Sequence, residues 1–185
     1  MTTVRINASD AVSIETSALI IGVHTTPEGP RPAPGGEGLD QALDGRLAEI
    51  LTTMGFTGKA EEVVKFPTLG ALPAPVAVAV GLGDVPQDED GYDLETLRRA
   101  AGAAVRALAG TPSAALALPA RTAAEAEAVA LGGLLGAYDF TRYRTGGDLK
   151  APVASLPSCP ARPGPRSPSR TRRRSPTPSP SSATW

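Results

Sequence analysis

The run P-V-A-V-A-V-G-L-G-D, residues 75–84, has the strongest strand character in the chain, and the rest of the fold is arranged around it. Small branched and unbranched apolar residues, bounded by prolines and glycines, predict a strand that is buried inside a sheet. A polar loop follows, and then a strongly periodic helix from about Asp93 to Ala109. Strand, glycine turn and helix also form the local shape of a phosphate-binding site, so this stretch raises a question of function as well as of fold.

Other segments predict the remaining strands and loops. We expect strands at Val4–Ile6, Ala18–Val23, Glu61–Phe66 and Ser113–Leu118. The segment Thr25–Gly38 holds four prolines and four glycines, and it is expected to be a loop. Strands that alternate with helices in this order predict an α/β domain, in which a mixed sheet is flanked by helices.

Three helices are predicted. Apolar residues recur at three- and four-residue spacing over Leu39–Met54, which predicts one amphipathic helix capped by Gly55. The helix Asp93–Ala109 begins with Asp93 as its N-cap. The last helix opens at Thr122, and Glu125 completes a capping box. The expected apolar face of this last helix consists of Ala126, Val129, Ala130, Leu134 and Tyr138.

Charge divides the chain of 185 residues into two parts. Residues 1–150 carry all 19 acidic residues and 12 of the 18 lysines and arginines, whereas residues 151–185 carry six arginines and no acid. The second part is made almost entirely of Pro, Ser, Arg, Ala and Thr, without any apolar period. Such a composition cannot bury a core, so residues 151–185 are predicted to form a disordered basic tail.

The chain offers few residues for chemistry. The single cysteine, Cys159, excludes an intrachain disulfide, and the N-terminus lacks the pattern of a signal peptide. No apolar run approaches the ~20 residues of a membrane span, so we expect a soluble cytoplasmic protein with no membrane partner. His24 is the only histidine, and alone it cannot form a two-histidine metal site or a nucleophilic triad. A structural role is favoured for it.

The acidic loop and the glycines also favour structural roles. Asp84, Asp88, Glu89 and Asp90 lack the alternating spacing of a calcium loop. The glycines Gly81 and Gly83 have no third glycine of a dinucleotide fingerprint, and about nine residues separate them from the next helix. A packing and turn role is therefore favoured over phosphate binding. No catalytic, cofactor-binding or metal-ligating residue is predicted in this chain.

Several segments together resemble one known family. They are G-L-G at 81–83, Y-D-L-E-T-L-R-R-A-A-G-A-A-V-R-A-L at 92–108, and above all Val129–Thr145, an apolar glycine-containing helix ending in G-A-Y-D-F-T-R-Y. In this order and spacing they resemble the N-terminal domain of the leucyl (cytosol) aminopeptidase family over roughly residues 1–150. The resemblance implies a macro-domain-like fold without catalytic residues.

The resemblance also implies what should lie elsewhere. In the family, a C-terminal domain holds two divalent metals, Mn or Zn, which activate a water for release of the N-terminal residue of a peptide, and the members assemble as hexamers. The family's metal signature, Asn-Thr-Asp-Ala-Glu-Gly-Arg, cannot occur here, because Asn7 is the only asparagine. We therefore expect the catalytic domain to be absent from this chain and the chain to be inactive alone. We hypothesise that residues from about Ser155 onward result from a frameshift, which the downstream DNA would test.

Two alternative functions remain open at this point. A macro-like fold suggests a free-standing module that binds ADP-ribose, for which Asp10 and Gly132–Gly133 are poor substitutes for the usual ligand-binding residues. The arginines among Ser-Pro pairs in S-P-S-R-T-R-R-R-S-P-T-P-S-P suggest contact with nucleic acid. This contact is not favoured, because no aromatic residue lies among the arginines and the family pattern ends where the tail begins.

Overall fold

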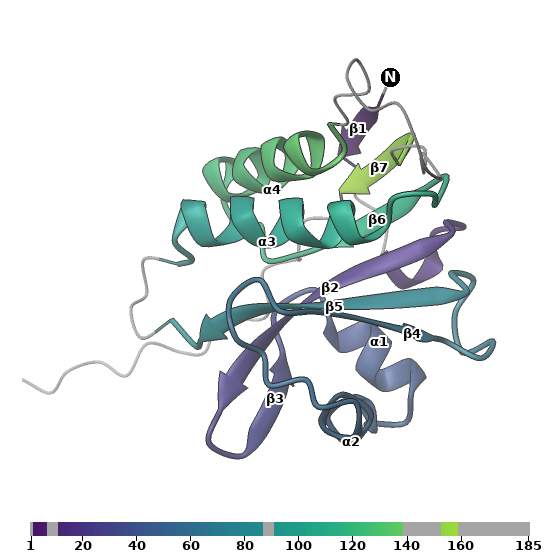
Figure 1. Ribbon diagram of the computed structural model, residues 1–185, viewed down its shortest axis with the longest axis vertical. Coiled ribbons are helices and arrows are strands. Elements are labelled where there is room, and N and C mark those ends of the chain that lie inside the picture. The colour runs from purple at the N-terminus through teal and green to yellow at the C-terminus, as the bar shows by residue number, and fades with distance from the viewer. Residues whose placement is uncertain (1, 7–10, 87–90, 139–152, 159–185) are drawn as a thin grey trace, which may run out of the picture.

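A computed structural model of the chain describes residues 2–6, 11–86, 91–138 and 153–158 (Figure 1). These residues form a seven-stranded sheet with the main order β1-β7-β6-β2-β5-β4, and β3 pairs with the end of β2. The strands are β1 Thr3–Ile6, β2 Ala18–Thr26, β3 Gly29–Pro32, β4 Val63–Pro67, β5 Val76–Asp84, β6 Ala114–Ala117 and β7 Ser155–Ser158. The helices are η1 Ala11–Ser13, a 3₁₀ helix, and α1 Glu37–Ala42, α2 Leu47–Thr53, α3 Leu94–Ala107 and α4 Ala123–Gly136.

The centre of the sheet consists of β2 and its two parallel neighbours, β5 and β6. Along β2, Ala18 and Ile20 pack into the core on one face, whereas Leu19 and Ile21 pack into the core on the other. A strand that is buried on both faces needs a continuous apolar run rather than an alternating one. This explains the sequence of β2 and of β5, and both predicted strands are confirmed.

Helices cover both faces of this sheet. Figure 1 shows α3 and α4 together on one side and α1 and α2 on the other. The sheet is mixed, because β3 and β4 run antiparallel to their neighbours and the other pairs are parallel. The predicted fold class is therefore confirmed. The predicted caps are also present: the Asp93 carboxylate accepts a hydrogen bond from Thr96 N at 2.8 Å, and Thr122 and Glu125 form a capping box.

The segment predicted to be a loop, Thr25–Gly38, instead begins with a hairpin and ends in α1. β2 continues to Thr26, and β3 returns along it in antiparallel register. Gly29, with φ of +118°, makes the turn possible. Within the described sheet β3 pairs only with β2, and an edge strand tolerates prolines that a central strand would exclude. The prediction of a loop was wrong because it treated the prolines as incompatible with any strand, whereas an edge strand tolerates them.

The prediction of a single helix over Leu39–Met54 is also wrong in one respect, because the structure has two helices there. The chain turns between α1 and α2 at Asp44 and Gly45, both with positive φ. The Asp40 carboxylate accepts a hydrogen bond from Leu47 N at 3.2 Å and so supports the start of α2. The apolar period continues through the break, since both helices pack on the same face of the sheet.

The apolar face predicted for α4 is largely wrong. Of its five residues only Val129 is buried, and the inward side of the helix is instead formed largely by small residues. A Cβ on Gly132 would collide with the carbonyl oxygen of Arg98, and one on Gly136 with that of Gly102. The glycines therefore let α3 and α4 approach closely, and the leucines of α4 point outward.

The sheet extends beyond the predicted domain boundary at residue 150. β7 lies between β1 and β6 and runs parallel to both. Val153 and Leu156 are fully buried, so the predicted disorder does not hold for residues 153–158. The frameshift hypothesis concerns the DNA and stays a prediction. Residues 159–185 lie outside the described residues, and their disorder stays a prediction.

Candidate functional site

The carboxyl ends of β2, β5 and β6 meet at one edge of the sheet, which is where open α/β folds bind ligands. The chain leaves β2 toward α1 and α2 on one face and leaves β6 toward α4 on the other. The neighbouring strands β2 and β6 therefore form a topological switch point. Three groups with polar chemistry are brought together at this edge: the imidazole of His24, the hydroxyl of Tyr92 and the carboxylate of Glu125.

His24 is buried at the end of β2, and both of its ring nitrogens are engaged. A register shift after Val23 places it opposite Gly83 of β5. Its Nδ1 lies 3.3 Å from the Gly83 carbonyl oxygen, and its Nε2 lies 2.8 Å from the Tyr92 hydroxyl. Because a carbonyl only accepts, Nδ1–H donates to Gly83, and neutral Nε2 accepts from Tyr92. The two rings also stack, with centroids 5.5 Å apart.

Burial keeps this pair neutral near pH 7. It lowers the pKa of His24, and the hydrogen bond to the Gly83 carbonyl opposes this shift only in part. Burial also raises the pKa of Tyr92 to about 12. Both nitrogens of this neutral imidazole are hydrogen-bonded to groups of the chain itself, and the structural role of His24 stays a prediction.

Glu125 fixes the loop before α3 to the start of α4. Its side chain is 2% exposed, and it accepts backbone hydrogen bonds from Tyr92 at 3.2 Å, Arg121 at 2.7 Å and Thr122 at 2.9 Å. Burial alone would raise its pKa, but the backbone N–H groups of Tyr92, Thr122 and Arg121 bring the pKa below its ordinary value. Gly91 passes so close that a Cβ there would lie 2.7 Å from Glu125 Oε1.

The two helices that begin at this edge therefore carry their own anions. Asp93 occupies the N-terminus of α3, and Glu125 occupies that of α4. Backbone N–H groups at such termini are what a bound phosphate would use. The hydrogen bond from Thr96 N, and then that from its hydroxyl, lower the pKa of Asp93. An incoming phosphate would meet two carboxylates here, so the edge does not favour a nucleotide.

The glycines that raised the question of phosphate binding have packing roles, as predicted. A Cβ on Gly81 would collide with the carbonyl oxygen of Lys59, and Gly83 N donates to the Gly58 carbonyl oxygen at 3.0 Å. They let the segment before β4 lie directly against β5. Gly132 has the same function between α3 and α4, and Asp10 lies outside the described residues.

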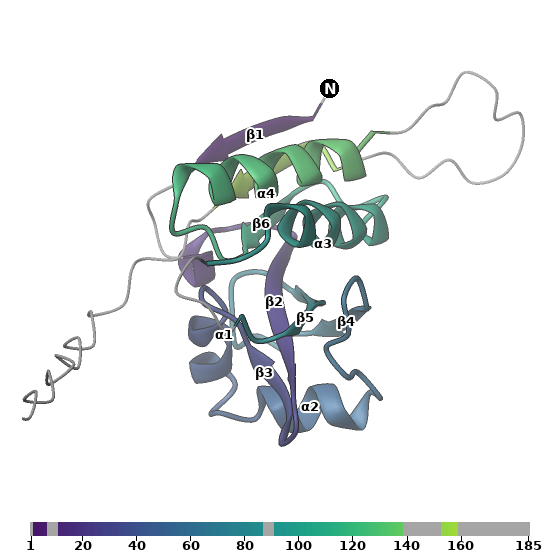
Figure 2. The same ribbon diagram turned by 90° about the vertical axis from the view of Figure 1, so that its left-hand side faces the viewer.

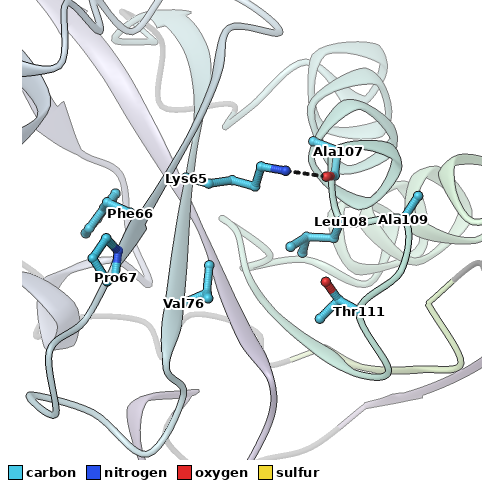
Figure 3. A pocket seen from close by; sticks show the side chains of 8 residues that line it. All are labelled: Lys65, Phe66, Pro67, Val76, Ala107, Leu108, Ala109 and Thr111. Carbon is cyan, nitrogen blue, oxygen red and sulfur yellow. Dashed lines mark hydrogen bonds between the residues drawn. The ribbon is translucent and has the colours of Figure 1, made fainter. Parts of the chain in front are cut away.

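A groove of about 390 Å³ lies at the opposite end of the sheet, between β4, β5 and the C-terminus of α3 (Figure 3). Lys65 is the only charged residue among the eight that line it, and Figure 3 shows its side chain reaching across to α3. Its Nζ donates to the Ala107 carbonyl oxygen at 2.8 Å. The lysine thus complements the negative end of the helix dipole, and the groove lining has no carboxylate or histidine for acid–base chemistry.

The outer side of α4 carries an exposed apolar stripe. Leu131, Leu134 and Leu135 are 42%, 39% and 57% exposed, and we call them the outer leucines. Their spacing of three and four residues places them on one side of the helix. Of these three, only Leu134 belongs to the predicted apolar face, and no role was predicted for Leu131 or Leu135.

Comparison with known proteins identifies the family. The model of the cytosol aminopeptidase family, N-terminal domain, matches residues 20–147. The chain belongs to the cytosol aminopeptidase family. It is 50% identical over 152 residues to a probable cytosol aminopeptidase of Streptomyces griseus, covering 82% of this chain and 30% of that relative. A probable cytosol aminopeptidase of Micrococcus luteus is 44% identical over 149 residues, covering 76% of this chain and 28% of the relative. The resemblance inferred from the sequence is thereby confirmed.

Solved structures agree on the fold. A mutant of tomato leucine aminopeptidase superposes with a TM-score of 0.63 at 21% identity, covering 89% of this chain and 34% of that one. The bottromycin maturation enzyme BotP gives a TM-score of 0.54 at 26% identity, over 78% of this chain and 27% of BotP. The macrodomain of Mycobacterium tuberculosis DarG gives 0.53 at 10% identity, over 85% of this chain and 99% of the macrodomain. The fold is therefore macro-domain-like, and the chain spans about 30% of the length of the curated relatives it matches.

Proposed function

We propose that this chain provides the non-catalytic N-terminal domain of a metal-dependent cytosol aminopeptidase, whose reaction releases N-terminal amino acids from peptides. The observation that carries the proposal is the family match over residues 20–147, which runs from β2 beyond the end of α4. The matched relatives contain a much longer chain, and we assign the reaction to the part of it that this chain does not span. We place the protein in the cytoplasm, in keeping with the description of its relatives as cytosol enzymes.

The described residues contain no group of three or more His, Cys, Asp or Glu residues that could hold a metal ion. The two divalent metals expected from the family do not fit these residues, and no catalytic step is assigned to them here. In the described ranges, no helix is both long and apolar enough to cross a membrane.

The proposal is tested by assaying the purified 185-residue chain with leucine p-nitroanilide in the presence of Mn²⁺ or Zn²⁺. The Streptomyces griseus relative, purified in the same way, serves as the positive control. We expect the chain to release no more p-nitroaniline than the metal-containing buffer alone. Hydrolytic activity that co-elutes with the chain on gel filtration, and that increases with the concentration of the chain, would overturn the proposal.

The alternative functions lead to different results. A ligand-binding module would show a saturable thermal shift with ADP-ribose, which the carboxylates at the N-termini of α3 and α4 disfavour. A nucleic-acid-binding protein would show salt-dependent RNA binding that is lost on deleting residues 159–185. These residues lie outside the described part of the chain, so this alternative stays a prediction.

A further inference from the structure

We propose that a groove on the side of the sheet covered by α1 and α2 binds a free α-amino acid with an apolar side chain. This groove, which we call the α1–α2 groove, has a volume of about 520 Å³ and lies between α1, α2 and the turn after β4. Figure 2 shows α1 and α2 at the opposite end of the molecule from α4. The inference goes beyond the proposed function, since it concerns binding and does not require hydrolysis.

The lining of the α1–α2 groove is largely apolar. It includes Leu43, Ile50, Met54, Phe66 and Leu69. Phe66 is 5% exposed and belongs to the core, whereas Met54 is 44% and Leu69 is 90% exposed. An apolar group that enters the groove would remove part of this exposed surface from water, which favours binding. The volume lies in the range of small-ligand sites, so the occupant we infer is a small molecule.

Internal hydrogen bonds hold both sides of the groove in place. On the side of the turn after β4, the hydroxyl of the buried Thr68 donates to the Ala74 carbonyl oxygen at 2.6 Å. On the side of the helices, the Asp40 carbonyl oxygen accepts from Gly45 N at 2.8 Å, and the Asp40 carboxylate accepts from Leu47 N at 3.2 Å. A site whose sides are already fixed loses little conformational entropy when a ligand binds.

Two residues of opposite charge, Asp44 and Arg46, line the groove. Arg46 pairs with Glu49 through its Nε at 3.5 Å, which leaves the two terminal nitrogens of the guanidinium to donate to a carboxylate. Within the described part of the chain, the Asp44 carboxylate takes part in no ion pair, either with Arg46 or with another residue. It can therefore accept hydrogen bonds from an ammonium group.

The charges and the lining together select the class of ligand. An α-amino acid carries its ammonium and its carboxylate on one carbon, so it can bridge two opposite charges that do not pair directly. Its carboxylate would accept from the Arg46 guanidinium, and its ammonium would donate to Asp44. Its apolar side chain would then lie against the apolar lining. A fatty acid would leave Asp44 without a cation, and Asp44 would repel a phosphate ester, so both fit less well.

The groove beside the C-terminus of α3 provides an internal comparison (Figure 3). Among the eight residues that line it, Lys65 is the only charged one, and its Nζ already donates to the Ala107 carbonyl oxygen. That groove offers no carboxylate to an ammonium group. We therefore expect the amino acid to bind in the α1–α2 groove and not beside α3.

The test is a titration of the 185-residue chain with leucine, followed by NMR signals of the methyl groups of Leu43, Ile50 and Leu69. Three further probes each lack one feature of the ligand. Leucinamide has no carboxylate, 4-methylpentanoate has no ammonium, and glycine has no apolar side chain. Weaker binding of all three would show that the site recognises both charges and the side chain.

Two variants each remove one charge from the groove. Asp44→Asn suits a backbone φ of +56°, because asparagine tolerates this region, and Arg46→Gln removes the guanidinium. Their matched controls are Asp84→Asn and Arg31→Gln, both at exposed residues outside the groove lining. Arg31 forms an exposed ion pair with a glutamate three residues away, as Arg46 does. Thermal unfolding of each chain verifies that the variants fold.

We expect saturable shifts with leucine at a dissociation constant of about 1 mM. The three other probes should bind the wild-type chain, and leucine should bind the two groove variants, about threefold or more weakly. The two control variants should bind leucine as the wild-type chain does. The inference is overturned if leucine causes no saturable shift in the groove, if any of the three probes binds as well as leucine, or if either groove variant binds leucine unchanged. Each of these results would leave the proposed function intact, because the p-nitroanilide assay tests that separately.

Discussion

Replacing Glu125 tests whether a single carboxylate fixes the loop before α3 to the start of α4. In Glu125→Ala, three backbone N–H groups lose their acceptor, namely those of Tyr92, Arg121 and Thr122. A buried donor left unpaired costs ~1–3 kcal/mol. Arg121 and Thr122 are exposed residues whose N–H groups can turn to water, so only the Tyr92 N–H is counted in full. The bond from the backbone N–H of residue 125 to the Thr122 hydroxyl is kept, so the expected total is about 2 kcal/mol.

Glu125→Gln is expected to cost about half as much, because it keeps one acceptor oxygen but loses the charge of the other. The assay is urea unfolding at pH 7, with amide hydrogen exchange measured at Tyr92. The control is Glu127→Ala on the same helix, an exposed carboxylate two residues away. A loss of less than 1 kcal/mol in Glu125→Ala, or an equal loss in the control, would refute the argument.

The pH dependence gives a second test of the same carboxylate. The folded-state pKa of Glu125 lies below its ordinary value of 4.5, so the folded protein binds fewer protons there than the unfolded chain. The stabilisation is therefore fully present above about pH 4.5 and is lost as the pH falls through the folded-state pKa. The difference in unfolding free energy between wild type and Glu125→Gln should be constant from pH 6 to 8 and narrow below pH 4.5. A difference that widens in acid would contradict the assigned direction.

Two further predictions concern packing. Gly132→Ala is expected to destabilise the folded chain by about 3 kcal/mol, because its Cβ would collide with the Arg98 carbonyl oxygen and separate α3 from α4. The measurement is thermal unfolding. The control Gly45→Ala has open space around its Cβ but a φ of +73°, and it should lose only about 1 kcal/mol of stability. A chain ending at Ser158 should melt at the temperature of the full chain, whereas one ending at residue 152 should be destabilised by about 4 kcal/mol, because it loses the buried side chains of Val153 and Leu156. If the two truncated chains unfolded at the same temperature, the domain boundary would lie at residue 150 as predicted.

The parts of the fold that could be predicted from the sequence are those with strong local signals. The continuous apolar runs of β2 and β5 indicate strands that are buried on both faces. The side chains of Asp93 and Thr122 mark the starts of α3 and α4, because a cap is decided by a few neighbouring residues. The helix α3 has a clear amphipathic period, and its core residues follow from that period.

The parts that could not be predicted depend on contacts between segments that are distant in the sequence. β7 has one apolar core residue, Leu156, and a proline, and only its place between β1 and β6 makes it a strand. The cluster of His24, Tyr92 and Glu125 joins three segments, and no spacing in the sequence relates them. The inward side of α4 was misassigned because glycines pack against a helix backbone only where another helix approaches closely, and hydropathy alone favours larger apolar residues such as Leu134 and Tyr138.

The edge of the sheet and the outer side of α4 together indicate how this domain contributes to its protein. At the edge, Glu125 and Asp93 occupy the helix N-termini that a phosphate would need, and His24 and Tyr92 satisfy one another. The macro-like architecture is thus retained, with carboxylates of the chain itself at the N-termini of α3 and α4. On α4, glycines pack inward and the outer leucines remain exposed. Capped helix N-termini and an apolar outer helix both fit the non-catalytic role that we propose for this domain.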